Sequence, residues 1–123
     1  MNHNVVGWFE IYVQDMPRAK AFYEAVLQKT LNPLPTEGMG MYEFPHNIEG
    51  YGAGGALVKM QGVPSCPGGT LVYFHCEDCA VEAQRIIEHG GRIFKAKTPC
   101  GDYGFIVLAY DSEGNMIGLH SMQ

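Results

Sequence analysis

The chain has 123 residues, of which 46% are hydrophobic and 17% are charged, which favours a folded domain and excludes a disordered tail. Its 8 Lys and Arg residues against 13 Asp and Glu residues give a net charge of −5, which argues against a nucleic-acid partner and an anionic membrane surface. Because no apolar run approaches the roughly 18 residues of a membrane span and residues 1–4 lack an export signal, we expect a cytoplasmic protein with no membrane partner.

The first half of the chain predicts a strand, a helix and three further strands. Residues 8–15 alternate in the manner of a strand. A helix over about 16–28 follows, because apolar side chains recur at helical spacing from Ala19 to Leu27 and Asp15 stands at the N-cap position. Strands are then predicted over about 30–34, 39–45 and 55–60, in runs bounded by Gly and Pro.

The second half predicts the same order of elements. Residues 61–69 contain two Pro and three Gly and form the predicted linker. A strand over about 71–78 leads into a helix over about 79–89, which ends at Gly90 and Gly91. Strands follow over about 92–97, 103–110 and 115–121. The two opening segments match at an offset of 63 residues, where Ile11 aligns with Phe74 and Val13 with Cys76.

This duplication predicts an α+β fold made of two tandem βαβββ modules. We expect a single domain over residues 1–123, with module one at 5–61, the linker at 61–69 and module two at 70–122. The modules should form a curved mixed sheet with the helices on its convex outside. The concave face is then a groove and the natural site for a ligand.

The segment from Trp8 to Tyr23 resembles the opening of the vicinal oxygen chelate superfamily, which includes glyoxalase I, bleomycin-resistance proteins and extradiol dioxygenases. Its string D-x-x-R-A-x-x-F-Y runs from Asp15 to Tyr23. The pair Gly90-Gly91 and a D-x-x-G-N-x-I string that starts at Asp111 also match. The resemblance implies paired βαβββ modules, a homodimer and often a divalent metal in the groove.

The metal enzymes of this superfamily carry one His, Glu or Gln ligand on each of four strands. The resemblance places these positions at Trp8, Leu57, Leu71 and Gly118. Such side chains donate no electron pair to a metal ion, so we predict no metal and no other cofactor. A shifted divalent-metal site that uses Glu10, His75 and His120 is an alternative, because these side chains are suitable donors.

Strand parity predicts which side chains line the groove, because successive residues of a strand point to opposite faces. Phe9, Ile11 and Val13 should face the helix, so Trp8, Glu10 and Tyr12 should face the groove. The other residues predicted to bind a ligand there are Leu57, Lys59, Leu71, Tyr73, His75, Gly118 and His120.

Glu10 is the most informative of these residues, because a carboxylate in an apolar strand must be hydrated or paired. One hypothesis is a catalytic pair in which Glu10 orients His120 and His120 acts as a base. The other is a structural hydrogen bond that joins the first strand to the last.

Cys76 and Cys79 form a C-x-x-C motif, which suits a redox pair or half of a zinc site. We favour two buried thiols, because the acidic neighbours Glu77 and Asp78 disfavour a thiolate.

Three functions follow from these residues. We expect a glyoxalase or bleomycin-resistance-like protein that binds a small organic molecule, with metal-independent lyase or isomerase chemistry at Glu10 and His120. A non-catalytic binding or sequestration protein, in which Trp8 and Tyr73 stack on a planar ligand, is the first alternative. A divalent-metal lyase of the glyoxalase I type with the shifted site is the second.

Overall fold

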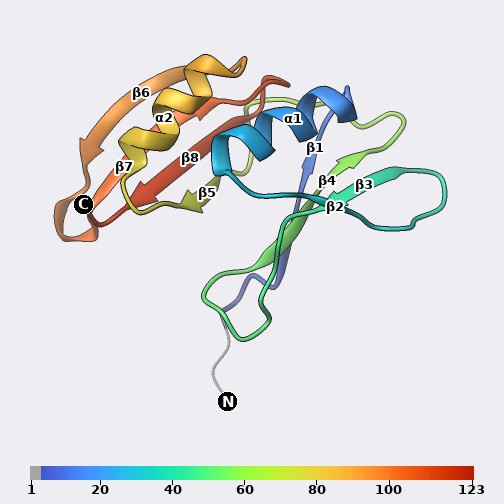
Figure 1. The fold of residues 1–123 in the computed structure, drawn as a ribbon, viewed down its shortest axis with the longest axis horizontal. Coiled ribbons are helices and arrows are strands. Elements are labelled where there is room, and N and C mark those ends of the chain that lie inside the picture. Colours follow the sequence, from blue (N-terminus) through green and yellow to red (C-terminus); the bar gives the residue numbers. More distant parts are fainter. Residues whose placement is uncertain (1–3) are drawn as a thin grey trace.

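The computed structural model describes residues 4–123, which form two βαβββ modules in tandem (Figure 1). The elements of the first are β1 (Trp8–Tyr12), α1 (Met16–Leu27), β2 (Asn32–Pro33), β3 (Gly40–Glu43) and β4 (Gly54–Lys59). Those of the second are β5 (Val72–His75), α2 (Cys79–Glu88), β6 (Arg92–Pro99), the 3-10 helix η1 (Gly101–Tyr103), β7 (Phe105–Tyr110) and β8 (Met116–Ser121). The predicted α+β fold class is confirmed.

Both helices begin and end close to the residues that the sequence predicts. Asp15 caps α1 by accepting a hydrogen bond from the backbone N–H of Arg18 at 3.1 Å. Asp78 caps α2 in the same way through the N–H of Ala80 at 3.0 Å. The chain leaves each helix through a left-handed residue, Gln28 after α1 (φ 56°) and Gly90 after α2 (φ 97°).

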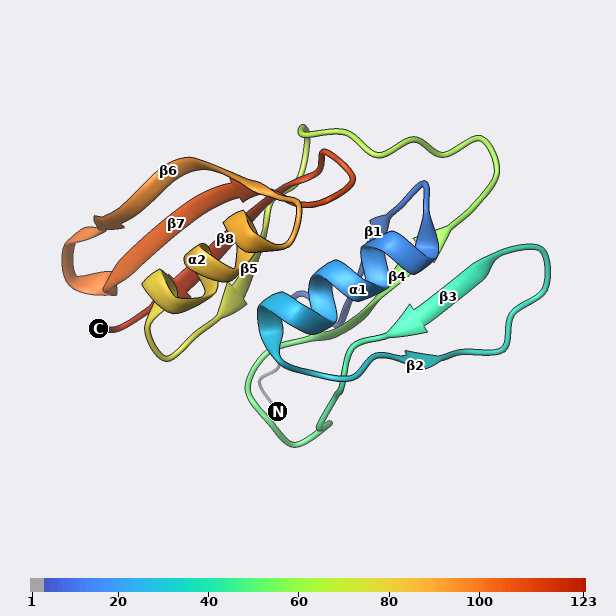
Figure 2. The same cartoon turned by 45° about the horizontal axis from the view of Figure 1, so that its top comes forward.

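The strands belong to two hydrogen-bonded sheets, in the orders β1-β4-β3-β2 and β5-β8-β7-β6. We call them the first and the second sheet. In each, the strand before the helix is an edge strand that pairs in parallel with the last strand of its module. The expectation of one continuous curved sheet is therefore corrected to two sheets, each with its helix on one face (Figure 2).

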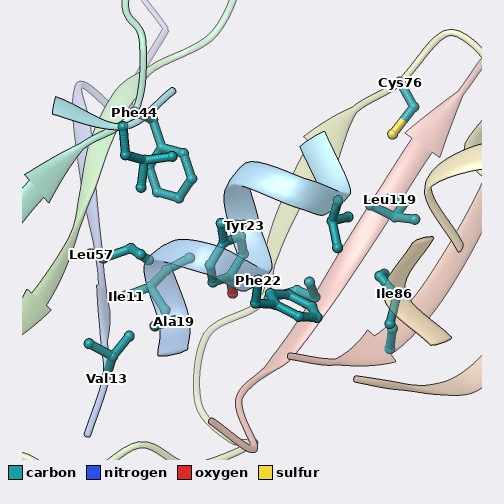
Figure 3. Packing of buried hydrophobic residues seen from close by; sticks show 14 of the residues in the cluster. Ile11, Val13, Ala19, Phe22, Tyr23, Phe44, Leu57, Cys76, Ile86 and Leu119 are labelled. Atoms are coloured by element: carbon teal, nitrogen blue, oxygen red, sulfur yellow. The ribbon is translucent and has the colours of Figure 1, made fainter. Parts of the chain in front are cut away.

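A single core shared by both modules joins the two sheets. Phe22 and Tyr23 of α1 lie at its centre, with Ile11 of the first sheet to one side and Leu119 of the second to the other (Figure 3). Because α1 packs against both modules and contacts α2, buried side chains connect the modules instead of a ladder between β1 and β5.

Several predicted strands are shorter in the structure, and for two of them the sequence gives a local reason. Pro33 and Pro35 lack the backbone N–H that a ladder requires, so the strand predicted over 30–34 is confined to β2. The strand predicted over 103–110 begins at Phe105, because Gly101 (φ 61°) and Gly104 (φ 92°) bend the chain into η1 before it.

Neither helix has the length of a membrane span, since α1 has 12 residues and α2 has 10. Within residues 4–123, then, the structure contains no helix that is long and apolar enough to cross a bilayer.

Candidate functional site on the outer faces of the sheets

The outer face of each sheet, which we define as the face turned away from the helices, carries most of the predicted groove residues. On β1, Ile11 is buried in the shared core, whereas the Trp8 side chain is 41% exposed on the outer face. Glu10 is exposed and Tyr12 is half-buried on the same face. The predicted parity of the first strand is confirmed.

The side chains of Trp8, Glu10 and Tyr12 form one hydrogen-bonded group. Trp8 Nε1 donates to one oxygen of the Glu10 carboxylate at 3.3 Å, and the Tyr12 hydroxyl donates to the other at 2.9 Å. The hydrogen bond to the carboxylate raises the pKa of Tyr12 above its ordinary value. Both oxygens of Glu10 thus have partners on its own strand.

The second sheet places the other predicted residues together. His75 on β5 is aligned with His120 on β8, and Tyr73 is aligned with Gly118 in the same register. With Ile106 of β7 and Tyr51, the two histidines and Tyr73 line a hollow of about 310 Å³. We call it the outer hollow.

Gly118 has a specific steric role in the outer hollow. A Cβ atom at this position would lie 2.4 Å from the ring of Tyr73. The absence of a side chain therefore allows the Tyr73 ring to lie across β8, where it remains 46% exposed. Leu71, which immediately precedes β5, is half-buried.

His120 is oriented by a backbone group of its own module. Its Nε2 lies 2.5 Å from the carbonyl oxygen of Tyr103. Because a carbonyl only accepts hydrogen bonds, Nε2 carries a proton and Nδ1 of the neutral ring is left as an acceptor. The expected Glu10–His120 contact is not formed within residues 4–123, because Glu10 is held by Trp8 and Tyr12 and His120 by Tyr103.

Tyr51 was not predicted from the sequence. It lies in the loop between β3 and β4 of the first module, and its ring centroid is 6.0 Å from that of His75 in the second. The side chain is 92% exposed, so this contact holds it only from one side. The glycines between positions 50 and 55 are typical of a loop, but no local pattern identifies the tyrosine that reaches across.

The predicted position of Leu57 and Lys59 in the groove is wrong, because their side chains lie on the helix side of the first sheet. Leu57 is aligned with Ile11 and is fully buried in the shared core. Lys59 has the same parity, and its Nζ donates to the carbonyl oxygen of Gln14 at 2.7 Å, beside the start of α1. The error is one residue of strand register, which moves every side chain to the opposite face.

The donor set of one chain does not fit a divalent metal. Trp8, Leu57, Leu71 and Gly118 offer no lone pair. For the shifted site, Glu10 lies on the first sheet, whereas His75 and His120 lie on the second. Across the described residues, 4–123, no three His, Cys, Asp or Glu side chains are grouped to hold an ion.

The C-x-x-C motif is buried, as the sequence predicts. Cys76 is 4% exposed and Cys79 is fully buried. Burial, followed by the charge of Glu82, raises the pKa of the Cys76 thiol to about 12, so this thiol stays protonated near neutral pH.

Solved structures with a similar fold come from several organisms. Glyoxalase I from Zea mays matches with a TM-score of 0.69 and 19% identity, over 94% of this chain and 45% of the maize chain. A hypothetical protein from S. aureus matches with a TM-score of 0.72 and 15% identity, over 98% and 95% of the two chains. An antibiotic binding protein from Streptomyces matches with a TM-score of 0.66 and 24% identity, over 98% of each chain. The chain thus spans less than half of the maize protein.

No curated protein matches the chain. The sequence profile of one family, however, covers residues 5–119, which is nearly the whole chain. The order of the elements, the duplicated modules and this match agree. The chain belongs to the Glyoxalase/Bleomycin resistance protein/Dioxygenase superfamily.

Proposed function

We propose that this protein binds a small planar organic molecule in the outer hollow, without a metal ion. The observation that carries this proposal is the lining of the hollow, in which four of the five side chains are rings: Tyr51, Tyr73, His75 and His120. Flat ring faces favour a flat ligand. The volume of about 310 Å³ is within the range of small-molecule sites.

The polar groups of the hollow indicate what the ligand carries. Tyr103 occupies Nε2 of His120, and Nδ1 is left to accept a hydrogen bond. A planar ligand with a hydroxyl or N–H group would therefore bind better than its unsubstituted ring. The similar Streptomyces protein is an antibiotic binding protein, and we extend small-molecule binding to this chain but not the identity of its ligand.

Metal-independent lyase or isomerase chemistry is the second candidate, and the hydrogen bond between His120 Nε2 and the Tyr103 carbonyl is the observation that favours it. The free Nδ1 lone pair can accept a proton from a bound substrate, and the Tyr103 carbonyl then stabilises the imidazolium through Nε2–H. In this mechanism the Tyr103 carbonyl, instead of Glu10, is the group that orients the base.

We also propose a homodimer. β1 and β5 are edge strands, so within residues 4–123 each has one side without a neighbouring strand. Pairing of β1 of one copy with β5 of another would cover both edges and bring Glu10 of one chain toward His120 of its partner. Light scattering of the purified protein tests this proposal, and a monomer at micromolar concentration would exclude it.

The test of ligand binding uses 2-naphthol, a flat ring with one hydroxyl group, and naphthalene as its matched control. In NMR titrations 2-naphthol should shift the signals of Tyr73, His75 and His120 and bind more tightly than naphthalene. Tyr73→Ala should weaken binding about tenfold, since stacking contributes about 1 kcal/mol or more. Val81→Ala, which changes an exposed residue of α2 away from the outer hollow, is the control and should leave binding unchanged.

The same titration separates the alternatives. Unshifted signals of the three rings, or equal losses of binding in Tyr73→Ala and Val81→Ala, would reject the outer hollow as the site. Unchanged binding in the presence of EDTA supports a site without metal. If a substrate is turned over, His120→Ala should abolish turnover and remove the preference for 2-naphthol over naphthalene, while the aromatic ring still binds against Tyr73; a sequestration protein shows no turnover with any ligand.

A further inference from the structure

A second and larger cavity lies between the two modules, on the other side of Tyr73 and His75. Its volume is about 800 Å³, which is enough for a drug-sized molecule. The β3–β4 loop, the residues at the end of α1, β5 and one side of α2 form its walls. We call it the intermodule cleft. It shares a rim with the outer hollow, but its interior is made of different side chains.

Three phenylalanine rings from separate strands and loops form an apolar wall of the cleft. Phe44 lies 5.6 Å from Phe9 and 5.7 Å from Phe74, measured between ring centroids. All three residues line the cleft. Such a wall accepts an aromatic ring, and ring faces also attract a cation.

The acidic group of the cleft is Glu82 on α2, whose side chain is only 17% exposed. One carboxylate oxygen lies 3.7 Å from an Arg85 nitrogen, which is too long for a hydrogen bond. The other oxygen is buried and has no hydrogen-bond partner within the described part of the chain. A buried carboxylate oxygen without a partner is costly, and it can be satisfied only by a donor because a carboxylate only accepts.

Glu82 forms an ion pair with Arg85, which also lines the cleft, but at 3.7 Å this pair makes no hydrogen bond to either carboxylate oxygen. The same Arg85 nitrogen donates to the carbonyl oxygen of Val26 at 3.2 Å, at the C-terminal end of α1. The Cys76 thiol lies within hydrogen-bonding reach of Glu82, but a thiol is a weak donor and leaves room for a stronger one. The negative end of the α1 dipole lies at the same wall, since Leu27 and Gln28 line the cleft. At the rim, the charges of Lys29 and Glu77 offset one another.

We propose that the intermodule cleft is a second binding site, which takes an aromatic molecule that carries a protonated amine or amidine. The ring lies against Phe44 and Phe74, and the N–H groups of the cation donate to Glu82. The two sites share Tyr51, Tyr73 and His75 at their rim. This proposal does not rest on the proposed function, because Glu82 and Phe44 line only the cleft.

Benzamidine and benzoate are matched probes for this site, since both are flat six-membered rings and their charges are opposite. In titrations of the isotope-labelled full chain, benzamidine should shift the amide signals of Phe44, Phe74 and Glu82 in a saturable way, and benzoate should not. Glu82→Gln should weaken benzamidine binding at least tenfold. Glu88→Gln, which changes another acidic residue of α2, is the control and should not weaken it.

Three results would overturn the proposal: no shifts at these residues, equal binding of benzoate, or unchanged benzamidine binding in Glu82→Gln. If Glu82→Gln does not fold, the comparison of the two probes on the unmodified protein still decides. Binding of 2-naphthol tests the outer hollow separately, and Glu82→Gln should leave it unchanged. Failure of one site is thus distinguishable from failure of the other.

Discussion

The two modules repeat one order of elements but differ in what their outer faces can do. On the first sheet, Glu10 accepts hydrogen bonds on both oxygens from Trp8 and Tyr12, so these three side chains already have partners. On the second sheet, His120 faces a hollow, and among residues 4–123 only one of its ring nitrogens has a hydrogen-bond partner. The duplicated fold thus sets the direction of corresponding side chains in both modules. Whether a side chain remains available to a ligand depends on its neighbours.

A second difference between the modules concerns the glycines that lie beneath aromatic rings. Gly55 of β4 lies under Phe9 on the core side, and Gly118 of β8 lies under Tyr73 on the outer side. In both places a Cβ atom would come within 2.4 Å of the ring. The first module uses this device to build the core, and the second uses it to shape the outer hollow.

The largest expected effect comes from the buried network that ties the modules together. Asp111 of the β7–β8 turn is 4% exposed and accepts hydrogen bonds from the Tyr23 hydroxyl at 2.6 Å and from the N–H groups of Glu113 and Asn115 at 2.8 Å. Asp111→Ala should lower the free energy of unfolding by about 3 kcal/mol or more, because buried donors lose their acceptor.

Urea unfolding followed by circular dichroism measures this loss. Asp102→Ala, which removes an exposed carboxylate of η1 in the same module, is the control and should cost less than about 0.5 kcal/mol. Equal stabilities of the two variants would show that the modules do not depend on this contact.

The next largest effect on stability is expected at the two glycines that lie under aromatic rings, Gly55 and Gly118. Gly55→Ala should destabilise the protein by about 1–3 kcal/mol, because Phe9 is fixed between Phe44 and Phe74 and its ring cannot move away. Gly118→Ala should cost less than about 1 kcal/mol, since the exposed Tyr73 ring can rotate into solvent. The second variant should instead weaken binding of 2-naphthol.

Thermal unfolding and the NMR titration measure the two effects side by side. A larger loss of stability in Gly118→Ala than in Gly55→Ala would contradict the assignment of these faces to ligand and core.

The smallest effect depends on pH. Burial disfavours the charged form of Glu113, but hydrogen bonds from Arg18 and from the backbone N–H groups of Asp15 and Gln14 outweigh it and lower its pKa from 4.5 to about 2. The unfolded chain therefore binds more protons below pH 4.5. The stabilisation is complete above about pH 5 and is lost as the pH falls toward 2.

The loss should be about 1 kcal/mol, because Arg18 is 55% exposed and solvent screens the pair. Urea unfolding at pH 6 and pH 3 tests it, with Glu113→Gln beside the unmodified protein and Glu49→Gln as an exposed control. The difference in stability between Glu113→Gln and the unmodified protein should shrink at pH 3. A difference that is the same at both pH values would exclude this origin.

The helices and strands, the duplication and the face of most strand residues could be predicted from the sequence alone. Periodicity, N-caps and glycine stops act over a few neighbouring residues, so Asp15, Asp78 and Gly90 mark the helices without any tertiary contact. The alternation of β1 likewise placed Ile11 in the core and Trp8 outside. The lack of metal-binding atoms at Trp8 and Gly118 is also visible in the sequence.

The contact and hydrogen-bond partners of these side chains depend on the tertiary structure. The register that buries Leu57 and the loop that carries Tyr51 to His75 depend on contacts between residues distant along the chain, which a local pattern does not encode. The same is true of the carbonyl that orients His120, since backbone groups leave no signature in the side-chain sequence. Because α1 packs against both modules, it sets the relative position of the two sheets, and the intermodule cleft lies between the modules.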